Sequence, residues 1–475
     1  MEEAHLTDRA PVFAILGHPN EGKSSVVATL AEDDSVRISP TPGETLKCLE
    51  YPVSIDGVEV IRFIDTPGFQ QPRHSLAWMQ NFEGPEANCI SEFIRTHQNN
   101  PDFSHECELL GPVADGAGII FVADGSRPVR QTDAVEMEIL RLTALPRLVV
   151  INPKDESDLT YLADWKAHAR KYFNTIRIFD AQRATYAERI ELLESLKMID
   201  PDWQAALTYV IDAFKQDWHQ RIAETANIIM GLVETAAGHL VKKTCRDFSR
   251  MDQVKRELAE KYRADIQHME QAAHKRIRKR FKHNIFNLEL PPRSILNEDL
   301  FSSRTWKVLG LNRWQLATAA GAGGGLIGAN IDLALAGLSF GVFTALGGAI
   351  GAGSAALGTD RMARTKILGL PVGRVKIRVG PIQNDQMLFV IIDRALIYFS
   401  HVINWAHSRR DQPQPPANAA AEEKSGYTTT WEGGLKQAGR RFFRAVRKGH
   451  TQRIEELKPR MIEAITTQLN NISNE

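Results

Sequence analysis

Eight residues near the start of the chain read Gly17-His18-Pro19-Asn20-Glu21-Gly22-Lys23-Ser24. They fit the pattern G-x-x-x-x-G-K-[ST], and they lie between an apolar run, Val12–Leu16, and a run typical of a helix, Lys23–Ala31. A strand before the pattern and a helix after it are the context that makes it specific. The glycines let the backbone curl so that successive N–H groups point at phosphate oxygens, where the helix N-terminus adds partial positive charge. We therefore expect this loop to bind the phosphates of a nucleotide.

Individual side chains of this loop have expected roles. Lys23 is placed to reach the β- and γ-phosphates as a point charge, and Ser24 to offer its hydroxyl to Mg²⁺. The expected nucleotide-binding residues of this part of the chain are Gly17, Asn20, Glu21, Gly22, Lys23, Ser24 and Ser25. A chance glycine-rich turn is the alternative, and the flanking strand and helix argue against it.

Further polar motifs follow two of the predicted strands. Asp65-Thr66-Pro67-Gly68 comes after Val58–Ile64, where an Asp can hold Mg²⁺ through a water and a glycine N–H can meet the γ-phosphate. Asn152-Pro153-Lys154-Asp155 comes after Leu148–Ile151, where an Asp can accept two hydrogen bonds from guanine. Between the first loop and Asp65 lies Pro40-Thr41-Pro42-Gly43-Glu44-Thr45, in which a threonine can complete the Mg²⁺ shell. Together these motifs predict a site for a guanine nucleotide.

Short apolar runs alternate with helical stretches from residue 11 to about residue 200. The expected strands, rich in β-branched and aromatic residues, are Val12–Leu16, Val58–Ile64, Gly118–Ala123, Leu148–Ile151 and Thr175–Phe179. Asp56-Gly57 separates Val53–Ile55 from Val58–Ile64, which predicts an antiparallel hairpin at one edge of a mostly parallel sheet. The expected fold class is therefore an α/β P-loop NTPase G domain with a doubly wound sheet, followed by a mainly α-helical C-terminal region.

In order, spacing and context, these motifs resemble those of the Era/TrmE-like branch of translation-factor-type G proteins, over residues 11–200. The G-x-P-N-x-G-K-S form of the first loop and the P-G-x-T form of Pro42–Thr45 are typical of that branch. The rest of the chain resembles a bacterial group of such GTPases with a C-terminal domain of unknown function. The resemblance implies that the chain binds and hydrolyses GTP with Mg²⁺ as cofactor.

The resemblance also implies roles for single residues. Lys23, Thr45 and Gly68 would act in hydrolysis, with Thr41 as a less favoured alternative to Thr45. The implied Mg²⁺ ligands are Ser24, Thr45 and Asp65. The implied residues around the base are Asn152, Lys154, Asp155 and Ala181. Within Asp180-Ala181-Gln182, only Ala181 agrees with the Ser-Ala-Lys-like loop of the family.

Three positions are notable against that family. Pro153 occupies the slot where the base motif of the family carries a lysine, so guanine is favoured but weak binding is expected. Phe69 stands where many G proteins carry a water-orienting glutamine, so unaided hydrolysis should be slow. Asn20 either helps to bind a K⁺ beside the phosphates or only suits the geometry of the loop, and the sequence leaves both interpretations open.

The composition excludes several classes of protein. Of 475 residues, 58 are Lys or Arg and 58 are Asp or Glu, so a protein that coats nucleic acid over its whole surface is disfavoured. The four cysteines lack the spacing of a zinc site and form no disulfide framework, which favours a reducing compartment. The first residues lack the basic and apolar regions of a secretory signal. We expect a cytoplasmic location.

The C-terminal half is expected to be built mainly of helices. Ala205–Val241 and Met251–His283 predict two long helices, Val375–Val379 a short strand, and Leu435–Asn471 a final helical segment with a basic start. The expected domains are 1–200 (G domain), 201–312 (long helices), 313–358 (glycine-rich apolar hairpin), 359–410 (small module), 411–430 (linker) and 431–475 (basic helix).

Leu316–Leu357 is the compositional outlier, because its only charged residue is Asp332 and glycine and alanine dominate. Glycines recur at four-residue spacing, as in Gly321 and Gly325, which lets helix backbones approach closely. Basic residues flank both ends, which suits a helical hairpin that enters the membrane from the cytoplasm. The favoured interpretation is thus a peripheral or hairpin-anchored protein at the inner membrane. A buried soluble pair of glycine-rich helices is the alternative.

Two basic clusters, 275–282 and 440–448, bear on the partners. Anionic lipid and RNA both attract such clusters, and a solvated helix face is the third interpretation. Lipid is favoured over RNA because the apolar segment lies nearby. The insert from Gln70 to Pro112 contains His74, Cys89, His105 and Cys107, whose irregular spacing favours ordinary packing or a partner-facing loop over a metal site.

Three hypotheses of function follow. The first is a GTP-dependent switch that couples its nucleotide state to a membrane or to a protein partner. The second is an assembly factor that binds RNA or ribosomes and uses the same switch. The third is a membrane-remodelling protein in which nucleotide drives self-association.

Overall fold

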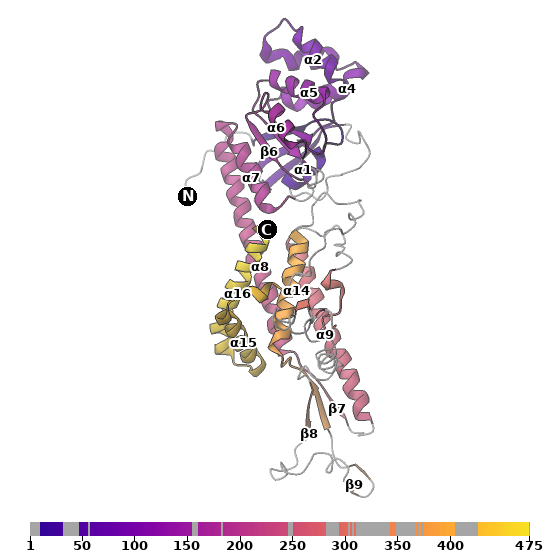
Figure 1. The fold of residues 1–475 in the computed structure, drawn as a ribbon, viewed down its shortest axis with the longest axis vertical. Coiled ribbons are helices and arrows are strands. Elements are labelled where there is room, and N and C mark those ends of the chain that lie inside the picture. The colour runs from indigo at the N-terminus through magenta and orange to yellow at the C-terminus, as the bar shows by residue number, and fades with distance from the viewer. Residues whose placement is uncertain are drawn as a thin grey trace. The chain divides into compact units, whose positions relative to one another are not determined.

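The structure is a computed structural model of the chain. It describes residues 10–31, 47–55, 58–153, 160–181, 184–245, 250–281, 294–302, 305, 308–309, 343–347, 366–367, 370–371, 375–403 and 426–474. These residues form two compact units (Figure 1). The first extends to Gln220, and the second comprises the described residues of 221–402 and of 426–473.

The first unit is built around a six-stranded sheet in the order β2-β3-β1-β4-β5-β6. The strands are β1 (Val12–Leu16), β2 (Leu49–Ile55), β3 (Val58–Asp65), β4 (Gly118–Asp124), β5 (Arg147–Asn152) and β6 (Thr175–Ile178). All neighbours are parallel except β2, which is antiparallel to β3 at the edge. The predicted strands, the edge hairpin and the doubly wound fold class are thereby confirmed.

Helices cover both faces of this sheet, so its central strands are apolar throughout. They are α1 (Lys23–Ala31), α2 (Pro72–Gln80), α3 (Cys89–His97), α4 (Ser104–Ala114), α5 (Gln131–Leu142), α6 (Leu162–Ala169), α7 (Tyr186–Lys197) and the first part of α8 (Gln204–Gly238). One core packs α1, α7 and α8 against β1 and β4, and the other packs α3, α4, α5 and α6 against the opposite face. Every residue of β4 is buried, as expected for a strand covered on both faces.

The insert predicted between Gln70 and Pro112 folds as α2, α3 and α4. Cys89 is buried in the core of the unit, and His97 packs between the rings of Phe93 and Phe103. Among the residues that the structure describes, no three His, Cys, Asp or Glu side chains are grouped to hold a metal. Cys89 and His97 therefore serve packing, whereas His74 is exposed and contacts the side chain of Gln71.

The second unit combines long helices with a small antiparallel sheet. Its elements are α9 (Met251–Arg280), α14 (Asp385–Ile403), α15 (Gly433–Lys448), α16 (Thr451–Asn474), β7 (Val241–Cys245), β8 (Phe343–Gly347), β9 (Lys366–Ile367), β10 (Leu370–Pro371) and β11 (Val375–Val379). The predicted long helices correspond to α8 and α9, and the predicted strand to β11. The sequence did not predict β7, which pairs with β11 across more than a hundred residues.

The expected helical hairpin of Leu316–Leu357 needs one correction. Phe343–Gly347 is a strand, β8, which pairs antiparallel with β11. The segment begins with Phe343 and Thr344, two residue types that are enriched in strands. The rest of the predicted hairpin, including Asp332, lies outside the described residues.

Helix α14 is the central helix of the second unit. Of the described helices, only α14 is long and apolar enough to cross a bilayer, and 72% of its apolar window is buried in the protein. Its two charged central residues are also buried: Arg394 donates to Glu270 on α9 at 2.6 Å, and Asp393 accepts from the hydroxyl of Thr428 at 2.8 Å. These contacts are those of a helix buried in a protein core, where charged side chains need such partners.

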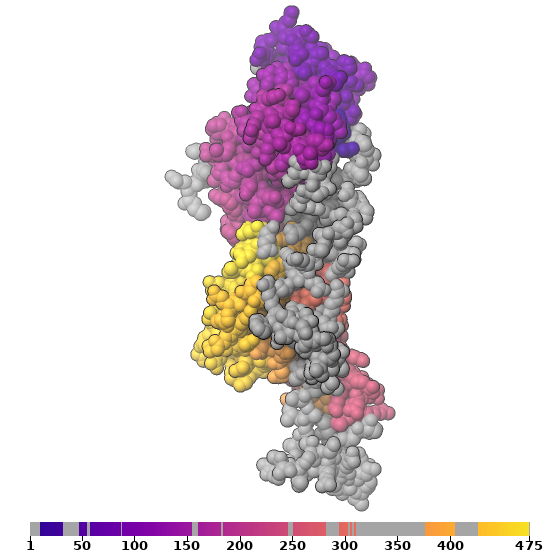
Figure 2. All heavy atoms as spheres, viewed as in Figure 1, coloured from indigo at the N-terminus to yellow at the C-terminus, as the bar shows by residue number. Residues whose placement is uncertain are grey.

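The C-terminal segment predicted as one helix is divided into α15 and α16. The division falls at Gly449, which has a left-handed φ of 67° that suits glycine at a helix C-terminus. Helix α15 buries Phe442 and Phe443, while Arg440 and Arg444 are exposed. In the space-filling view α15 and α16, coloured yellow, lie at the surface (Figure 2).

Candidate functional site

The loop between β1 and α1 has the backbone conformation that its glycines were expected to provide. Gly17 has a φ of 144° and Gly22 a φ of 98°, a region that L-amino acids with a side chain rarely adopt. A Cβ atom on Gly17 would run into the carbonyl oxygen of Val122, and one on Gly22 into the side-chain amide of Asn152. Both positions therefore require glycine, for the conformation and for the close approach.

Asn20 lies at the tip of the same loop with a φ of 67°. Asparagine tolerates the left-handed region better than most residues, because its side chain can hydrogen-bond locally. Loop geometry is thus sufficient to explain the residue type at this position. The alternative role in binding K⁺ stays a prediction.

Lys23, the first residue of α1, points its amine back into the loop. Its Nζ donates to the carbonyl oxygens of Gly17 at 3.2 Å and of His18 at 3.0 Å. Burial lowers the pKa of Lys23, while the nearby charge of Asp65 acts in the opposite direction. The loop therefore holds a buried ammonium group in its centre, where it can meet an anionic oxygen.

Two oxygen ligands of the kind that Mg²⁺ prefers meet beside this ammonium group. The hydroxyl of Ser24 donates to Oδ2 of Asp65 at 2.6 Å, so the first residues of α1 and the end of β3 converge. Hydroxyl and carboxylate oxygens suit this hard cation, and the pair fits the predicted Mg²⁺ site. Thr45, the third predicted ligand, and its alternative Thr41 lie outside the described residues.

The segment after Asp65 packs tightly against the loop. The hydroxyl of Thr66 donates to the carbonyl oxygen of Ile15 at 2.6 Å. Gly68 lies so close to Pro19 that a Cβ atom would overlap the proline ring. The side chain of Phe69 is 0% exposed and belongs to the core below the sheet, so it points away from solvent and cannot orient a water.

The predicted base residues are brought together in part. The side chain of Asn152, at the end of β5, donates to the carbonyl oxygen of Glu21 at 3.0 Å and accepts from the N–H of Ala181 at 3.2 Å. Thr29 on α1 also donates to the carbonyl oxygen of Ala181, at 3.0 Å. Asn152 therefore ties the loop to the segment after β6. Lys154 and Asp155 lie outside the described residues.

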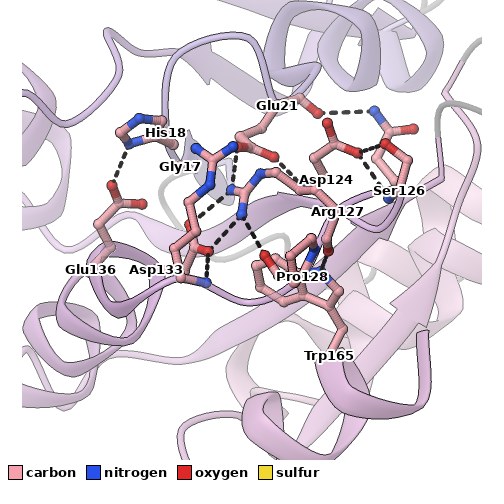
Figure 3. Close-up of polar contacts among 12 residues, drawn as sticks. Gly17, His18, Glu21, Asp124, Ser126, Arg127, Pro128, Asp133, Glu136 and Trp165 are labelled. Atoms are coloured by element: carbon pink, nitrogen blue, oxygen red, sulfur yellow. Dashed lines mark hydrogen bonds and ion pairs between the residues drawn. The ribbon is translucent and has the colours of Figure 1, made fainter. Parts of the chain in front are cut away.

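A network of charged side chains that the sequence did not predict holds Glu21 of the loop (Figure 3). Arg127, in the segment after β4, lies 2.5 Å from Glu21 and 2.7 Å from Asp133 of α5. Burial alone would lower the pKa of Arg127, but its hydrogen bond to Asp133 and the charge of Glu21 raise it, so it stays charged. Trp165 of α6 donates its indole N–H to the carbonyl oxygen of Arg127 at 2.7 Å. Glu21 is thus fixed by its contacts with Arg127 and with the N–H of Asp124.

A second pair links the loop to α5. Nδ1 of His18 lies 2.8 Å from Oε1 of Glu136, whose side chain is 0% exposed (Figure 3). The hydrogen bond to Glu136 raises the pKa of His18. Burial raises the pKa of Glu136 to about 7, although His18 acts in the opposite direction. The hydrogen bond between these two side chains therefore fixes the loop at His18 to α5.

The position of Arg127 near the site could have been predicted from the sequence. Asp124-Gly125-Ser126-Arg127 directly follows a fully apolar strand, and polar residues at the carboxyl end of a parallel strand commonly line a site. Asp124 accepts from the N–H and hydroxyl of Ser126, which fixes the turn that carries Arg127. The partners Asp133 and Glu136 on α5 gave no such signal, because acidic residues on a helix usually face solvent.

Comparison with known proteins divides the chain in two. Residues 12–153 match the family described as "50S ribosome-binding GTPase". Residues 166–470, more than half of the chain, match the family described as "Domain of unknown function (DUF3482)".

Individual relatives match the N-terminal part. GTPase Der of Bifidobacterium longum is 27% identical over 228 residues, which are 48% of this chain and 42% of that protein. The tRNA modification GTPase MnmE of Pseudothermotoga lettingae is 27% identical over 145 residues, 30% of this chain and 26% of that protein. The chain therefore spans less than half the length of these curated relatives.

A solved structure is also similar to part of the chain. It is Era in complex with MgGDPNP and nucleotides 1506–1542 of 16S ribosomal RNA, with 21% identity and a TM-score of 0.29. The match covers 40% of this chain and 57% of that one.

Proposed function

Because the chain belongs to the family of the domain of unknown function DUF3482 and carries an Era/TrmE-like GTPase domain before it, we propose that it is a GTP-dependent switch whose C-terminal unit acts on a partner. The observation that carries the proposal is the cluster of Lys23, Ser24 and Asp65 at the mouth of a loop built for phosphate. In such switches the γ-phosphate orders nearby loops, and hydrolysis releases them. GTP and GDP are the expected ligands.

Each described residue of the cluster has a defined task in this proposal. The N–H groups of the loop and the amine of Lys23 hold the phosphates, and Ser24 and Asp65 hold Mg²⁺. A Mg²⁺ held by these two residues would supply positive charge beside the phosphate oxygens. Gly68 offers its N–H to the γ-phosphate. Because the residue directly after Gly68 is the buried Phe69 and not a glutamine, hydrolysis should be slow without a K⁺ or a partner.

Guanine is the base we propose for this site. The support is the sequence Asn152-Pro153-Lys154-Asp155 at the end of β5, with Asn152 already tied to the loop and to Ala181. Asp155 would accept hydrogen bonds from guanine that adenine cannot offer. Pro153 in place of a lysine removes a side chain that would lie on the base, so we expect moderate affinity.

Nucleotide binding by the full chain tests the proposal directly. Titration with fluorescent GDP, GTP and ATP analogues at millimolar Mg²⁺ should show binding of the guanine nucleotides in preference to ATP. Lys23→Ala should abolish that binding, whereas Lys171→Ala, at an exposed position of the same unit, should not. Unchanged GTP affinity in Lys23→Ala would overturn the site, and a wild-type chain that holds no guanine nucleotide would overturn the function.

A cytoplasmic location with attachment to the inner membrane is part of the proposal. It rests on the sequence of Leu316–Leu357, with one charge among glycine, alanine and apolar residues. The full chain should sediment with membranes, and deletion of residues 316–357 should release it. If the intact chain stays in the soluble fraction with and without GTP, this part of the proposal is lost.

An RNA partner is the second candidate, and α15 favours it. Arg440, Arg441, Arg444 and Lys448 lie on one exposed face of α15, and none of the four has an ion-pair partner among the described residues. The apolar face of α15 is buried, so this helix cannot insert its apolar side chains into a bilayer, as an amphipathic membrane helix does. Arginine binds phosphates of RNA in a two-pronged geometry. One matching family is described as a ribosome-binding GTPase, and one relative is named a tRNA modification GTPase, which agrees with this candidate.

The two candidates predict different effects of one variant. Replacing Arg440, Arg441 and Arg444 by glutamate should abolish binding to RNA in a filter assay if RNA is the partner. It should instead reduce flotation with anionic liposomes if lipid is the partner. Arg453→Glu, at an exposed position of α16, is the matched control. Self-association driven by nucleotide, the third hypothesis, would appear as a GTP-dependent change of mass in solution.

A further inference from the structure

Helix α4 carries two carboxylates that accept hydrogen bonds from the main chain of two segments near the candidate site: Gln70 and Gln71 after Gly68, and Cys48 before β2. Glu106 lies in the first turn of α4, and its Oε1 accepts from the N–H groups of Gln70 at 2.7 Å and of Gln71 at 2.5 Å. Glu108, two residues further, accepts from the N–H of Cys48 at 2.8 Å. Residues two apart on a helix point in different directions, so α4 lies between the two segments that it holds.

Glu106 binds the main chain just after Gly68, the residue predicted to contact the γ-phosphate. Gln70 and Gln71 follow Gly68 by two and three residues, and both of their side chains are exposed. The segment is therefore fixed by the buried ring of Phe69 and by the carboxylate of Glu106, whose side chain is 0% exposed. A buried carboxylate that receives two main-chain N–H groups is a strong and directional contact.

The second oxygen of Glu106 shows that the contact has a cost. Within the described part of the chain, Oε2 of Glu106 is buried and has no hydrogen-bond partner. Burying a polar oxygen in this way is unfavourable unless the other contacts of the group offset it. A leucine would pack at this position without that cost, so packing alone does not account for a glutamate.

Glu108 contacts Cys48, the residue directly before β2. The thiol of Cys48 donates to the main-chain carbonyl oxygen of Glu108 at 3.2 Å, beside the hydrogen bond from the Cys48 N–H. Burial raises the pKa of Cys48 to about 12, so the thiol keeps its proton and can donate at neutral pH. Two contacts therefore fix Cys48 to α4.

We propose that α4 couples these two segments and that Glu106 is a positioning residue for GTP hydrolysis. This inference rests on the proposed function, because it assigns Glu106 the task of holding the main chain that follows Gly68. Through Glu108, a movement of the segment at Cys48 would be transmitted to Gln70 and Gln71 by one rigid helix.

The test compares three variants of Glu106 in the full chain. Glu106→Ala removes both hydrogen bonds and should lower kcat for GTP about ten-fold or more, with KM and GDP affinity unchanged, because a misplaced loop costs rate rather than binding. Glu106→Gln keeps an oxygen that can accept both N–H groups and should retain most of the wild-type rate. Glu106→Asp is one methylene shorter and should be intermediate.

A readout of position separates this role from a merely structural one. Amide exchange at Gln70 and Gln71 should become faster in Glu106→Ala and stay near wild type in Glu106→Gln, with or without nucleotide. If Glu106→Ala and Glu106→Gln lose thermal stability equally while kcat is unchanged, Glu106 is only structural. If Glu106→Ala does not fold, the proposal is tested by kcat of the other two variants. A lower kcat in Glu106→Asp than in Glu106→Gln supports the positioning role, and equal kcat values overturn it.

Coupling is tested by a double-mutant cycle with Glu108→Ala. If α4 links the two segments, the effects of Glu106→Ala and Glu108→Ala on kcat should be non-additive, whereas additive effects refute the coupling. GTP binding by the wild type separates a failure of the proposed function from a failure of the role proposed for Glu106. Loss of GTP binding in the wild type overturns the proposed function, while a Glu106→Ala variant with normal affinity and normal kcat overturns only the inference.

Discussion

Replacing Asp393 by asparagine should stabilise the second unit at pH 8 and much less at pH 5. Asp393 lies in the middle of α14, is 0% exposed, and accepts from the N–H and the hydroxyl of Thr428 at 2.7 and 2.8 Å. Burial raises the pKa of this carboxyl to about 7, because the charged form loses its hydration. The hydrogen bonds from Thr428 and the charge of Lys436 act in the opposite direction but are weaker.

The size of the effect follows from the protons bound in each state. In the unfolded chain the carboxyl has the ordinary pKa of 3.8, so between about pH 4 and pH 7 folding takes up a proton. A group whose pKa is raised by folding contributes less stability as the pH rises through this window. Each unit corresponds to about 1.4 kcal/mol, so the wild type loses about 3 kcal/mol from this group between pH 5 and pH 8. Asparagine has no proton to lose and escapes this loss.

Urea denaturation of the full chain at pH 5 and pH 8, with calorimetry to follow each unit, measures the difference. Asp252→Asn on α9 is the control, because the side chain of Asp252 is 84% exposed and stays hydrated. Other groups that titrate in this range cancel when variant and wild type are compared at the same pH. A free-energy change from Asp393→Asn that is the same at both pH values would refute the reasoning, since Asp393 would then be ionised in the folded protein.

Three further outcomes are expected at the nucleotide site. Phosphate release from GTP should be several-fold faster in K⁺ than in Na⁺ at equal ionic strength, because Asn20 can offer an oxygen to K⁺ and Phe69 is buried; equal rates would remove the role of K⁺. Gly68→Ala should lower the rate of hydrolysis about ten-fold with unchanged GDP affinity, because its Cβ would overlap Pro19, and a wild-type rate would contradict that packing. Gly22→Ala should abolish binding of a fluorescent GDP analogue, because a φ of 98° strains any residue with a side chain; normal binding would show that the loop tolerates a different backbone.

The sequence predicted the parts of the fold that depend on local pattern. The strands β1, β4 and β5 each contain a continuous apolar run, as expected for parallel strands that are covered on both faces. The phosphate loop was equally predictable, because only glycine adopts the φ of Gly17 and Gly22 at no cost. The edge hairpin followed from Asp56-Gly57, whose turn preference is also local.

Contacts between distant residues could not be predicted in the same way. The polar side chains of Glu106, Asp133 and Glu136 lie on helices, where a carboxylate normally faces water, and only the packed structure shows them buried against main-chain N–H groups, Arg127 and His18. The strand β7 was missed because its five residues contain two lysines and a threonine, and its pairing with β11 is far away in the chain.

The amino-acid sequence by itself therefore determined the glycine loop after β1, the strands of the sheet and its antiparallel edge pair, because glycine conformation and apolar periodicity act within a few residues. The roles of Ser24 and Asp65 as Mg²⁺ ligands stay predictions. Only the tertiary structure decided that Glu106 and Glu108 accept main-chain N–H groups of residues 70–71 and of Cys48, and that α14 is a buried core helix whose charged side chains have partners. Those features arise when segments far apart in the chain are packed together, because a buried charge is strongly destabilising unless its partner lies beside it.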